Sequence, residues 1–445
     1  MKNIPRRFDR ISFRFNTCES AVRKVLSGLF SDRLVPPDRS LGDFYRVNRK
    51  CGSRDRNFIN TCVYSILRRW GWLRTLMPQT VLDMIEQGNS GVLQRRDIAA
   101  MTLFSLLCDG NSDPDMLNEL AQVAEVIVPD TSADTPEERA FEASVIFGNA
   151  VKFSSSMLAP EEFCAMTPDA EDYAGYMKRL SVRPPMWIRF SSPEVRRAVL
   201  DEFDAKDIAY DLYKDFATSI YAGKVNLAGL ESFQKGFFEV QDLASMCVTF
   251  ACAPSAGERW YDACAGAGGK TLHLASLMNG KGSITAGDIR VSALEELKKR
   301  ARRAGWSNIT VRPHDGGAWK GKHKFDGVLV DAPCSGSGVW RRNPGLQWRL
   351  TSRDVQSFAE RQLAILENNA PAVKPGGRLV YATCSIFTAE NEDVAMRFLE
   401  RNRDFYAEKF SHPLSGKECC GAMRAGNGQA DCDELFAFVM RRKEA

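Results

Sequence analysis

Residues 260–271 of the 445-residue chain read Trp-Tyr-Asp-Ala-Cys-Ala-Gly-Ala-Gly-Gly-Lys-Thr. This stretch combines the end of an apolar strand, a loop of small residues and the start of a helix. A phosphate-binding P-loop would need Gly where Cys264 stands, and the pattern G-x-G-x-x-G would need Gly where Thr271 stands. What remains is Asp262-x-Cys-x-Gly-x-Gly268. A ligand can approach the backbone of such a loop closely, and the helix that follows offers N–H groups to the ligand's polar end.

The chain after this loop alternates strand and helix patterns, which predicts a parallel sheet with crossover helices, an α/β Rossmann-like domain. In that setting the loop suits the amino-acid moiety of S-adenosylmethionine, although a tight turn packed for steric reasons is the alternative. Asp288 ends the next strand-like run, where a carboxylate can accept hydrogen bonds from ribose hydroxyls. Asp315 follows a third run and would meet the adenine amine. A single aspartate is more often a loop cap, but three at successive strand ends favour a nucleoside ligand.

Two cysteines stand in short motifs of small residues. Cys334 lies in Asp331-Ala-Pro-Cys-Ser-Gly-Ser-Gly338, and Cys384 lies in Ala382-Thr-Cys-Ser385. Each motif follows an apolar run with strand character, so both thiols are expected at strand ends, where open α/β sheets bind ligands. A buried, inert cysteine is the alternative for either one alone. The two contexts together favour thiol chemistry.

A thiol beside a methyl donor fits one reaction well. The C5 carbon of a pyrimidine is too weak a nucleophile to take a methyl group directly, whereas addition of a thiolate at C6 makes C5 enamine-like. Loss of the C5 proton then allows the thiol to leave, so one difficult step becomes several easier ones. The reacting thiol must be shifted towards thiolate by a nearby positive group, for which Lys270 is the leading candidate. Asp331 is placed to hold the N3/N4 edge of a cytosine.

Charge is distributed unevenly along the chain. The net charge of +4 is too small to establish a polyanionic partner by itself. Residues 1–75 carry 17 Lys/Arg against 6 Asp/Glu, residues 81–150 carry 3 against 13, and residues 290–325 carry 10 against 3. Any one block fits a solvated face equally well. Two basic blocks flanking a catalytic-looking segment favour a phosphate backbone as partner.

Cysteine and histidine usage argues against a metal site. The 13 cysteines include no C-x-x-C pair, and there are only four histidines, so neither zinc nor a disulfide framework is expected. No run approaches the roughly 20 apolar residues needed to span a bilayer, and the Arg-rich start is not followed by an apolar signal core. We therefore expect a cytoplasmic protein with free thiols and no membrane partner.

The periodicity divides the chain into four parts. Helical spacing of apolar residues predicts an all-α domain over residues 1–150. Residues 151–182 are taken as a linker, residues 183–255 as a small α+β lead-in, and residues 256–445 as the Rossmann-like core. The oligomeric state is not encoded in any motif, and we favour a monomer.

At this level of detail the sequence resembles the RsmB/Sun-type RNA (cytosine-5) methyltransferase family. The N-terminal segments resemble the NusB-like RNA-binding domain that precedes the catalytic core in the ribosomal RNA branch. The motifs that carry the resemblance are Cys51–Arg56, Val63–Arg68, Phe238–Ser245, Asp262–Thr271, Phe325–Gly338, Arg341–Pro344 with Trp348-Arg349, Gly376–Ser385 and Glu390-Asn-Glu392.

The resemblance implies roles that the residues alone left open. The Thr-Cys-Ser cysteine, Cys384, would attack C6, and the Pro-Cys-Ser-Gly cysteine, Cys334, would assist release of the methylated RNA. Arg341 and Arg342 would contact RNA phosphates. The implied S-adenosylmethionine site consists of Cys264, Ala265, Gly266, Ala267, Gly268, Gly269, Lys270, Asp288, Asp315 and Asp331.

Some positions depart from the family pattern. Ala267 replaces the usual proline of Ala-Pro-Gly-Gly-Lys, Gly345 stands where an aspartate often follows Asn-Pro, and residues 433–438 differ from the usual Asp-Gly-Phe-Phe. None removes a group that the chemistry requires. The sequence therefore predicts S-adenosylmethionine-dependent cytosine-5 methylation of RNA, with small-subunit ribosomal RNA as substrate. A transfer RNA substrate and a non-catalytic, RNA-binding ribosome-assembly factor are the alternatives.

Overall fold

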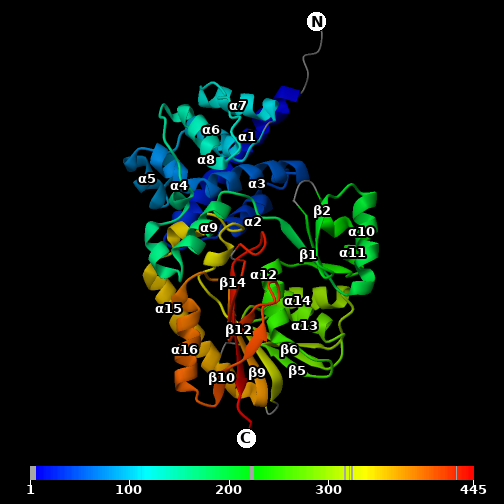
Figure 1. The fold of residues 1–445 in the computed structure, drawn as a ribbon. Coiled ribbons are helices and arrows are strands. Elements are labelled where there is room, and N and C mark those ends of the chain that lie inside the picture. Colours follow the sequence, from blue (N-terminus) through cyan, green and yellow to red (C-terminus); the bar gives the residue numbers. More distant parts are fainter. Residues whose placement is uncertain are drawn as a thin grey trace. The chain divides into compact units, whose positions relative to one another are not determined.

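The structure is a computed structural model of the chain. It describes residues 7–111, 113–220, 225–314, 317–319, 321, 324–426 and 428–444, and it does not describe the side chains of residues 7–14. The chain forms two compact units (Figure 1). The first comprises Met1–Cys164, Tyr173–Arg183 and Trp340–Leu350, and the second comprises Ala165–Asp172, Pro184–Val339 and Thr351–Ala445.

The first unit is helical throughout its described residues, as the apolar spacing predicted. Its helices are α1 (Arg7–Phe30), α2 (Pro37–Val47), α3 (Ser53–Arg68), α4 (Trp70–Leu76), α5 (Gln79–Glu86), α6 (Arg95–Cys108), α7 (Pro114–Ala124), α8 (Pro136–Ala143) and most of α9 (Ala170–Leu180). Helix α6 is buried from Ile98 to Cys108, which makes it the centre of this core. Both α7 and α8 begin with proline after a capping side chain, because proline needs no N–H partner there and the cap satisfies a free backbone donor.

Residues 151–182, where we expected a linker, instead fold. They form the 3-10 helices η3 (Ser155–Leu158) and η4 (Glu161–Met166) and the helix α9. Leu158 and Phe163 are at most 1% exposed, and the Trp72 indole donates a hydrogen bond to the Ser154 carbonyl at 2.8 Å. The apolar residues here are spaced by short turns rather than by one long period, so the sequence pattern did not reveal them.

A segment from within the predicted catalytic core also belongs to the first unit. Trp340 is 1% exposed, and its ring lies 5.6 Å from that of Phe163. The Gln347 amide donates to the Leu158 carbonyl at 3.0 Å. Trp340–Leu350 therefore completes the helical core, which corrects the expectation that all of residues 256–445 form the Rossmann-like domain.

The second unit begins with the predicted α+β lead-in. Four antiparallel strands run in the order β2 (Tyr210–Tyr213), β3 (Ala217–Ile220), β1 (Met186–Phe190) and β4 (Phe238–Val240). The helices α10 (Arg196–Ala205) and α11 (Glu231–Gln234) accompany them. Phe203 of α10 packs edge-on against Phe238 of β4, with the ring centroids 5.9 Å apart. Strands β1 and β3 are buried on both faces: Ile188 and Ile220 pack in the cluster that includes Phe203, whereas Trp187 and Ala217 join the core that contains Trp260.

The main sheet of the second unit has eight strands, in the order β10-β14-β9-β8-β5-β6-β7, with β13 also paired to β14. Five strands are parallel: β5 (Arg259–Asp262), β6 (Ser283–Asp288), β7 (Ile309–Pro313), β8 (Phe325–Asp331) and β9 (Val373–Thr383). Antiparallel pairing adds β10 (Phe405–Ala407), β13 (Ala422–Ala425) and β14 (Leu435–Arg442). The hairpin of β11 (Lys409–Ser411) and β12 (Glu418–Cys420) is separate. Strand β5 is flanked by β6 and β8, so the order reverses there and creates a topological switch point.

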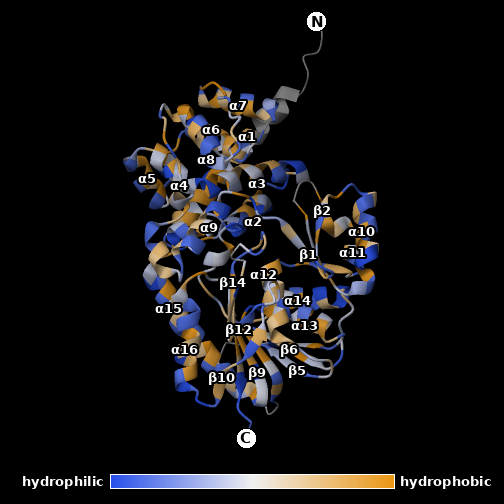
Figure 2. Cartoon of the chain, in the orientation of Figure 1, coloured by the Kyte–Doolittle hydropathy of each residue, from blue (hydrophilic) through white to orange (hydrophobic). Residues whose placement is uncertain are grey.

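Both faces of this sheet are buried, because successive strand residues point to opposite sides. Trp260, Leu329 and Val380 join the core with α12 (Leu243–Cys252) and α13 (Gly269–Leu277). Tyr261, Val330 and Tyr381 join the core with α15 (Ser352–Asn369) and α16 (Glu392–Arg401). Helix α12 is mostly orange in Figure 2, whereas α16 alternates between blue and orange and buries only one side. The two cores hold the sheet rigid and present its carboxyl edge as a platform.

Candidate active site

Four parallel strands place polar groups at one edge of the main sheet. Asp262 ends β5, Asp288 ends β6, Asp331 ends β8 and Thr383 ends β9. In parallel strands the carboxyl ends share one edge, and ligands bind there beside the switch point. This arrangement brings Asp262, Asp288 and Asp331 and both cysteine motifs to one side of the sheet.

The small-residue loop after β5 is held in a tight conformation. Gly268 has φ +90°, and a Cβ added there would lie 2.5 Å from the Leu297 Cγ of α14 (Val291–Arg303). Gly266 has φ +53° and donates its N–H to the Asp288 carboxylate at 2.8 Å. Helix α13 starts at Gly269, so its first N–H groups face the same edge. Glycine is thus required at Gly268 both for its backbone conformation and for its close contact.

Asp288 is 6% exposed and holds the turn after β6 together. Its carboxylate accepts hydrogen bonds from the Arg290 backbone N–H at 2.8 Å and from the Arg290 guanidinium at 3.1 Å. Burial raises the pKa of Asp288, but the hydrogen bonds from Arg290 and Gly266 outweigh it and leave the pKa below its usual value. Asp288 is therefore an ionised acceptor at the loop.

Asp262 is buried without an opposing charge in contact. One carboxylate oxygen accepts from the Thr271 hydroxyl at 2.7 Å, and the other, Oδ1, has no hydrogen-bond partner among the described residues. Burial raises the pKa of Asp262 to about 7, an effect that the Thr271 hydrogen bond opposes and the charge of Asp331 reinforces. A buried acceptor without a donor is costly, and it is the kind of atom that a ligand's N–H group satisfies.

Lys270 and Asp331 form an ion pair of 2.7 Å across the loop and the end of β8. Burial acts to lower the pKa of Lys270, but Asp331 outweighs it, and the net shift is upwards. The charge of Cys384 also acts on Lys270. Lys270 therefore remains cationic, and its direct partner is Asp331.

The two cysteines predicted at strand ends lie together. Cys334 Sγ and Cys384 Sγ are 3.2 Å apart, within hydrogen-bond distance for sulfur. The hydrogen bond with Cys384, then burial, and then the charges of Cys384 and Glu390 raise the pKa of Cys334 well above its usual value. Cys334 thus retains its proton and can donate it in a hydrogen bond to the Cys384 sulfur.

The loop also depends on a residue of the lead-in that sequence reasoning missed. Arg300 of α14 donates to the Ala267 carbonyl at 2.9 Å and, through two nitrogens, to Glu239 Oε2 at 2.9 and 3.1 Å. Arg303 donates to the other Glu239 oxygen at 2.5 Å. Glu239 is 2% exposed and lies within the Phe238–Ser245 motif, which was the only available signal.

A cavity of about 330 Å³ lies at the ends of β6 and β7. Its lining includes Tyr261, Gly287, Pro313, His314 and Trp319. Asp315, expected to meet an adenine, lies outside the described residues.

Arg341, for which the resemblance implied RNA phosphates, is 2% exposed. Its Nε donates to the Val182 carbonyl at 3.4 Å within the first unit. Burial and this contact make Arg341 a structural residue of the helical core rather than a surface cation.

The described residues lack two kinds of feature. No group of three or more His, Cys, Asp or Glu side chains there is arranged to hold a metal ion. Nor does that part of the chain contain a helix of the length and apolarity that a bilayer crossing requires.

Comparison with known proteins gives relatives for the catalytic region. A family model described as 16S rRNA methyltransferase RsmB/F matches residues 249–431. The probable ribosomal RNA small subunit methyltransferase B of Bacillus subtilis is 37% identical over 228 residues, 50% of this chain and 51% of that one. The ribosomal RNA small subunit methyltransferase B of an Enterobacter species is 36% identical over 227 residues, 49% and 52% of the two chains. The chain spans about half the length of the curated relatives it matches.

Solved structures match over more of the chain but at lower identity. The crystal structure of PH0851 has a TM-score of 0.72 at 23% identity and covers 95% of this chain and 98% of its own. NSun6 from Pyrococcus horikoshii with SFG has a TM-score of 0.56 at 19% identity, covering 64% and 97%. They show a Rossmann-like methyltransferase fold with a mixed sheet and a helical N-terminal region. Over residues 249–431 the chain is similar to the RsmB/F methyltransferases, and the solved structures share its fold.

Proposed function

We propose that this protein methylates C5 of a cytosine in small-subunit ribosomal RNA, with S-adenosylmethionine as the methyl donor and a covalent cysteine adduct at C6. The observation that carries the proposal is the pair of thiols 3.2 Å apart, at the same sheet edge as the Lys270–Asp331 ion pair of 2.7 Å and the glycine loop. Thiol, cation, carboxylate and donor loop are the groups that this reaction needs.

The residues present fit S-adenosylmethionine. The buried Asp262 oxygen without a donor and the free N–H groups at the start of α13 suit a zwitterionic amino-acid moiety. Residues 264–270 with Asp288 and Asp331 would hold it, the 330 Å³ cavity would take the adenine, and Asp315, which lies outside the described residues, is proposed to bind the adenine amine. NSun6 from Pyrococcus horikoshii was crystallised with SFG, an analogue of this cofactor. When bound, S-adenosylmethionine supplies an electrophilic methyl group on a sulfonium sulfur.

The protein's own groups then divide the work. The Cys384 thiolate, favoured by the Lys270 charge, forms a bond to C6, while Asp331 holds the N3/N4 edge and stabilises a ring protonated at N3, which takes up the electron pair displaced by the addition. Carbon C5 takes the methyl group and afterwards loses its proton to a base. As the C6–sulfur bond breaks, its electron pair returns to Cys384, and the Cys334 S–H hydrogen bond stabilises the departing sulfur. The target base must be unstacked, because the thiol reaches C6 only from the ring face.

The helical first unit would bind the RNA, in the manner of a NusB-like domain. Its support is a group of exposed cations on and around α2 and at the start of α3. They are Arg33, Arg39, Arg46, Arg49, Lys50, Arg54 and Arg56. Such a surface binds phosphates without reading sequence. The ribosomal substrate rests on the family description and on the names of the curated relatives, and with it a cytoplasmic location and a monomer are proposed.

Bisulfite sequencing of total RNA, from cells with and without the gene, tests the proposal directly. We expect one 5-methylcytosine of small-subunit ribosomal RNA to be lost and to return with the purified enzyme and methyl donor. Loss of a transfer RNA site instead would select the alternative substrate. Cofactor binding with no lost methylcytosine in any RNA would leave a non-catalytic RNA-binding factor.

A further inference from the structure

Glu390 is a fully buried carboxylate that no part of the mechanism above uses. It ends the 3-10 helix η10 (Thr388–Glu390), directly after the Cys384 motif, and is 0% exposed. Among the described residues its carboxylate makes no ion pair and accepts hydrogen bonds from four neutral donors. These are Ser335 N at 2.9 Å, Gln362 Nε2 at 2.8 Å, Ser335 Oγ at 2.5 Å and Ser385 Oγ at 2.6 Å. A buried charge is tolerated only when its oxygens are saturated in this way.

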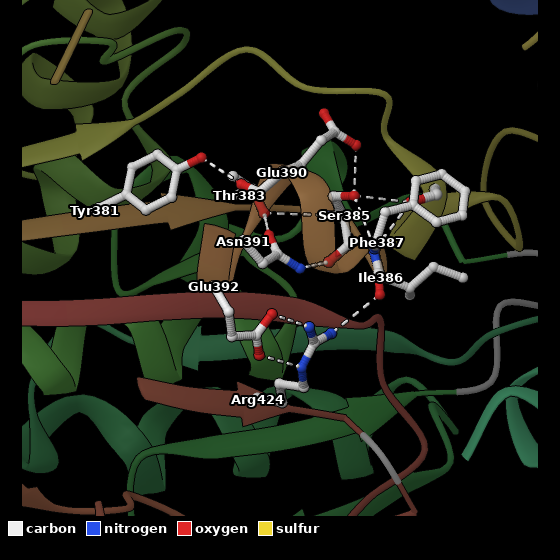
Figure 3. A network of polar contacts seen from close by, with 10 residues as sticks. Tyr381, Thr383, Ser385, Ile386, Phe387, Glu390, Asn391, Glu392 and Arg424 are labelled. Atoms are coloured by element: carbon white, nitrogen blue, oxygen red, sulfur yellow. Dashed lines mark hydrogen bonds and ion pairs between the residues drawn. The ribbon is translucent and has the colours of Figure 1, made fainter. Parts of the chain in front are cut away.

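The two serines reveal what Glu390 connects. Ser335 follows Cys334 and Ser385 follows Cys384 in the sequence. Both hydroxyls bind the same oxygen, Glu390 Oε2, so one atom joins the loops that carry the two thiols. Figure 3 shows Glu390 reaching Ser385 while the next residues anchor the same loop. The separation of the thiols therefore depends on this carboxylate.

Neighbouring groups keep Glu390 itself in place. The Tyr381 hydroxyl donates to the Glu390 carbonyl at 2.5 Å, and the Gln362 amide also donates to the Pro333 carbonyl at 3.0 Å. Asn391 accepts from the Thr383 hydroxyl at 2.5 Å and donates to the Ser385 carbonyl at 2.8 Å (Figure 3). The carboxylate is thus held from the strand, from α15 and from its own turn.

We propose that Glu390 is the positioning residue that sets the distance between the two thiols, by binding the serine that follows each of them. The inference rests on the proposed cysteine mechanism for its consequence in catalysis, although the thiol geometry can be measured without any RNA. The charge of Glu390 has a second effect, since it adds to the raised pKa of Cys334 after the Cys384 hydrogen bond and burial. The titratable groups that act with Cys334 are Cys384, Glu390 and Tyr381.

Disulfide formation reports the distance between the thiols. With diamide as the oxidant, the two thiols lose two protons and two electrons to the diazene, which becomes a hydrazine, and a sulfur–sulfur bond forms. We expect peptide mass spectrometry to find the Cys334–Cys384 disulfide quickly in the wild type, because its sulfurs start 3.2 Å apart. In Glu390→Ala it should form at least tenfold more slowly. The exposed carboxylate of Asp393 provides a matched control, and Asp393→Ala should match the wild type.

The isosteric variant separates geometry from charge. Glu390→Gln retains an acceptor for Ser335 N–H and Gln362, and the serine hydroxyls can rotate to accept from its amide. Its disulfide rate should stay within about threefold of the wild type. With RNA substrate, kcat should fall about 10²-fold in Glu390→Ala, the size of effect that a misplacement of about 1 Å produces, while KM for the methyl donor stays within twofold. In Glu390→Gln the limb of the pH–rate profile assigned to Cys334 should move to lower pH.

The outcomes separate this inference from the proposed function. A wild-type disulfide rate and wild-type kcat in Glu390→Ala would overturn the positioning role. A slowed disulfide without methylation of any RNA by the wild-type enzyme would sustain the positioning role and remove the proposed reaction. If Glu390→Ala fails to fold, the double variant Ser335→Ala with Ser385→Ala removes both hydroxyl bonds and leaves the carboxylate. Its disulfide should form about threefold to tenfold more slowly, and an unchanged rate would equally overturn the inference.

Discussion

Two buried glutamates hold the two halves of the active site, and they do so by different physical means. Glu239 binds Arg300 and Arg303, and through Arg300 it holds the Ala267 carbonyl of the donor loop. Glu390, within the described part of the chain, binds neutral donors and no cation, and it holds the thiol loops. A charge paired with two arginines has little effect beyond them, whereas a charge left unpaired acts on the groups around it. The donor loop is thus held by Glu239, whose charge is neutralised by two arginines. The thiol loops are held by Glu390, whose charge also acts on Cys334.

Asp262 is a third buried carboxylate. Among the described residues it has neither a pair of arginines, as Glu239 has, nor a full set of neutral donors, as Glu390 has. It has one neutral donor, Thr271, and one oxygen without a partner among the described residues. Its pKa is raised to about 7, with burial as the largest cause. Burial with a single neutral donor therefore favours the protonated form of Asp262.

The largest effect on methyl transfer is expected when the thiol of Cys384 is removed. Cys384→Ala should lower methyl transfer by roughly 10⁴-fold or more, because it removes the thiol that makes the bond to C6, and no protein–RNA adduct should form. Cys334→Ala should instead accumulate a stable adduct on denaturing gels, since release is impaired. If the adduct is lost in Cys334→Ala and trapped in Cys384→Ala, the two roles are exchanged.

The next largest effect is the pH dependence that Asp262 gives to the stability of the fold. Asp262 binds a proton in the folded state up to about pH 7, whereas an unfolded aspartate has lost it above about pH 4. The folded state then binds more protons than the unfolded state between these values, so stability falls as pH rises through this window, by up to about 4 kcal/mol at 1.36 kcal/mol per unit.

Asp262→Asn retains the acceptor for Thr271 and removes the titration. The difference in unfolding free energy between wild type and variant, measured by urea titration from pH 4 to pH 8, should therefore change across this window and level off above it. A difference that does not vary with pH would mean that Asp262 is ionised throughout.

A smaller effect on stability is expected when the ion pairs of Glu239 are removed. Glu239→Ala leaves Arg300 and Arg303 without their shared partner in a largely buried place. We expect a loss of roughly 2–3 kcal/mol, below the range for fully buried pairs because both arginines keep some exposure. Glu231, paired with Lys235 at the surface, is the control, and Glu231→Ala should cost under about 1 kcal/mol. If the two variants unfold at the same urea concentration, Glu239 contributes no more to the stability of this unit than a surface ion pair does.

The smallest effect tests how the hydrogen bonds of Arg300 influence binding of the methyl donor. Arg300→Lys keeps the charge but cannot bind Glu239 and the Ala267 carbonyl with one planar fork. KM for S-adenosylmethionine should rise about tenfold with kcat within about twofold, because the loop is less ordered before binding. A fall in kcat at constant KM would instead link Arg300 to the chemical step. Arg300 and Glu390 would then affect the same step of the reaction.

The parts of the site that sequence could predict are those with local signals. Small residues after an apolar run place the donor loop, Cys334 and Cys384 at strand ends, and the structure brings the two thiols together with Lys270 and Asp331. The role of Glu390 has no such signal, because its partners Ser335 and Gln362 lie 55 and 28 positions away. Long-range packing decided it, as it decided the folding of residues 151–182.

The membership of Trp340–Leu350 in the first unit has a consequence for biosynthesis. A ribosome delivers the helices of that unit first, but Trp340 and Gln347, which contact Phe163 and the Leu158 carbonyl, emerge only after β5 to β8 have been made. The helical core therefore remains open while most of the second unit's parallel strands are translated. Folding of the amino-terminal unit is thereby timed by a segment of the catalytic region, and neither unit can be expressed as an uninterrupted piece of the chain with its core complete.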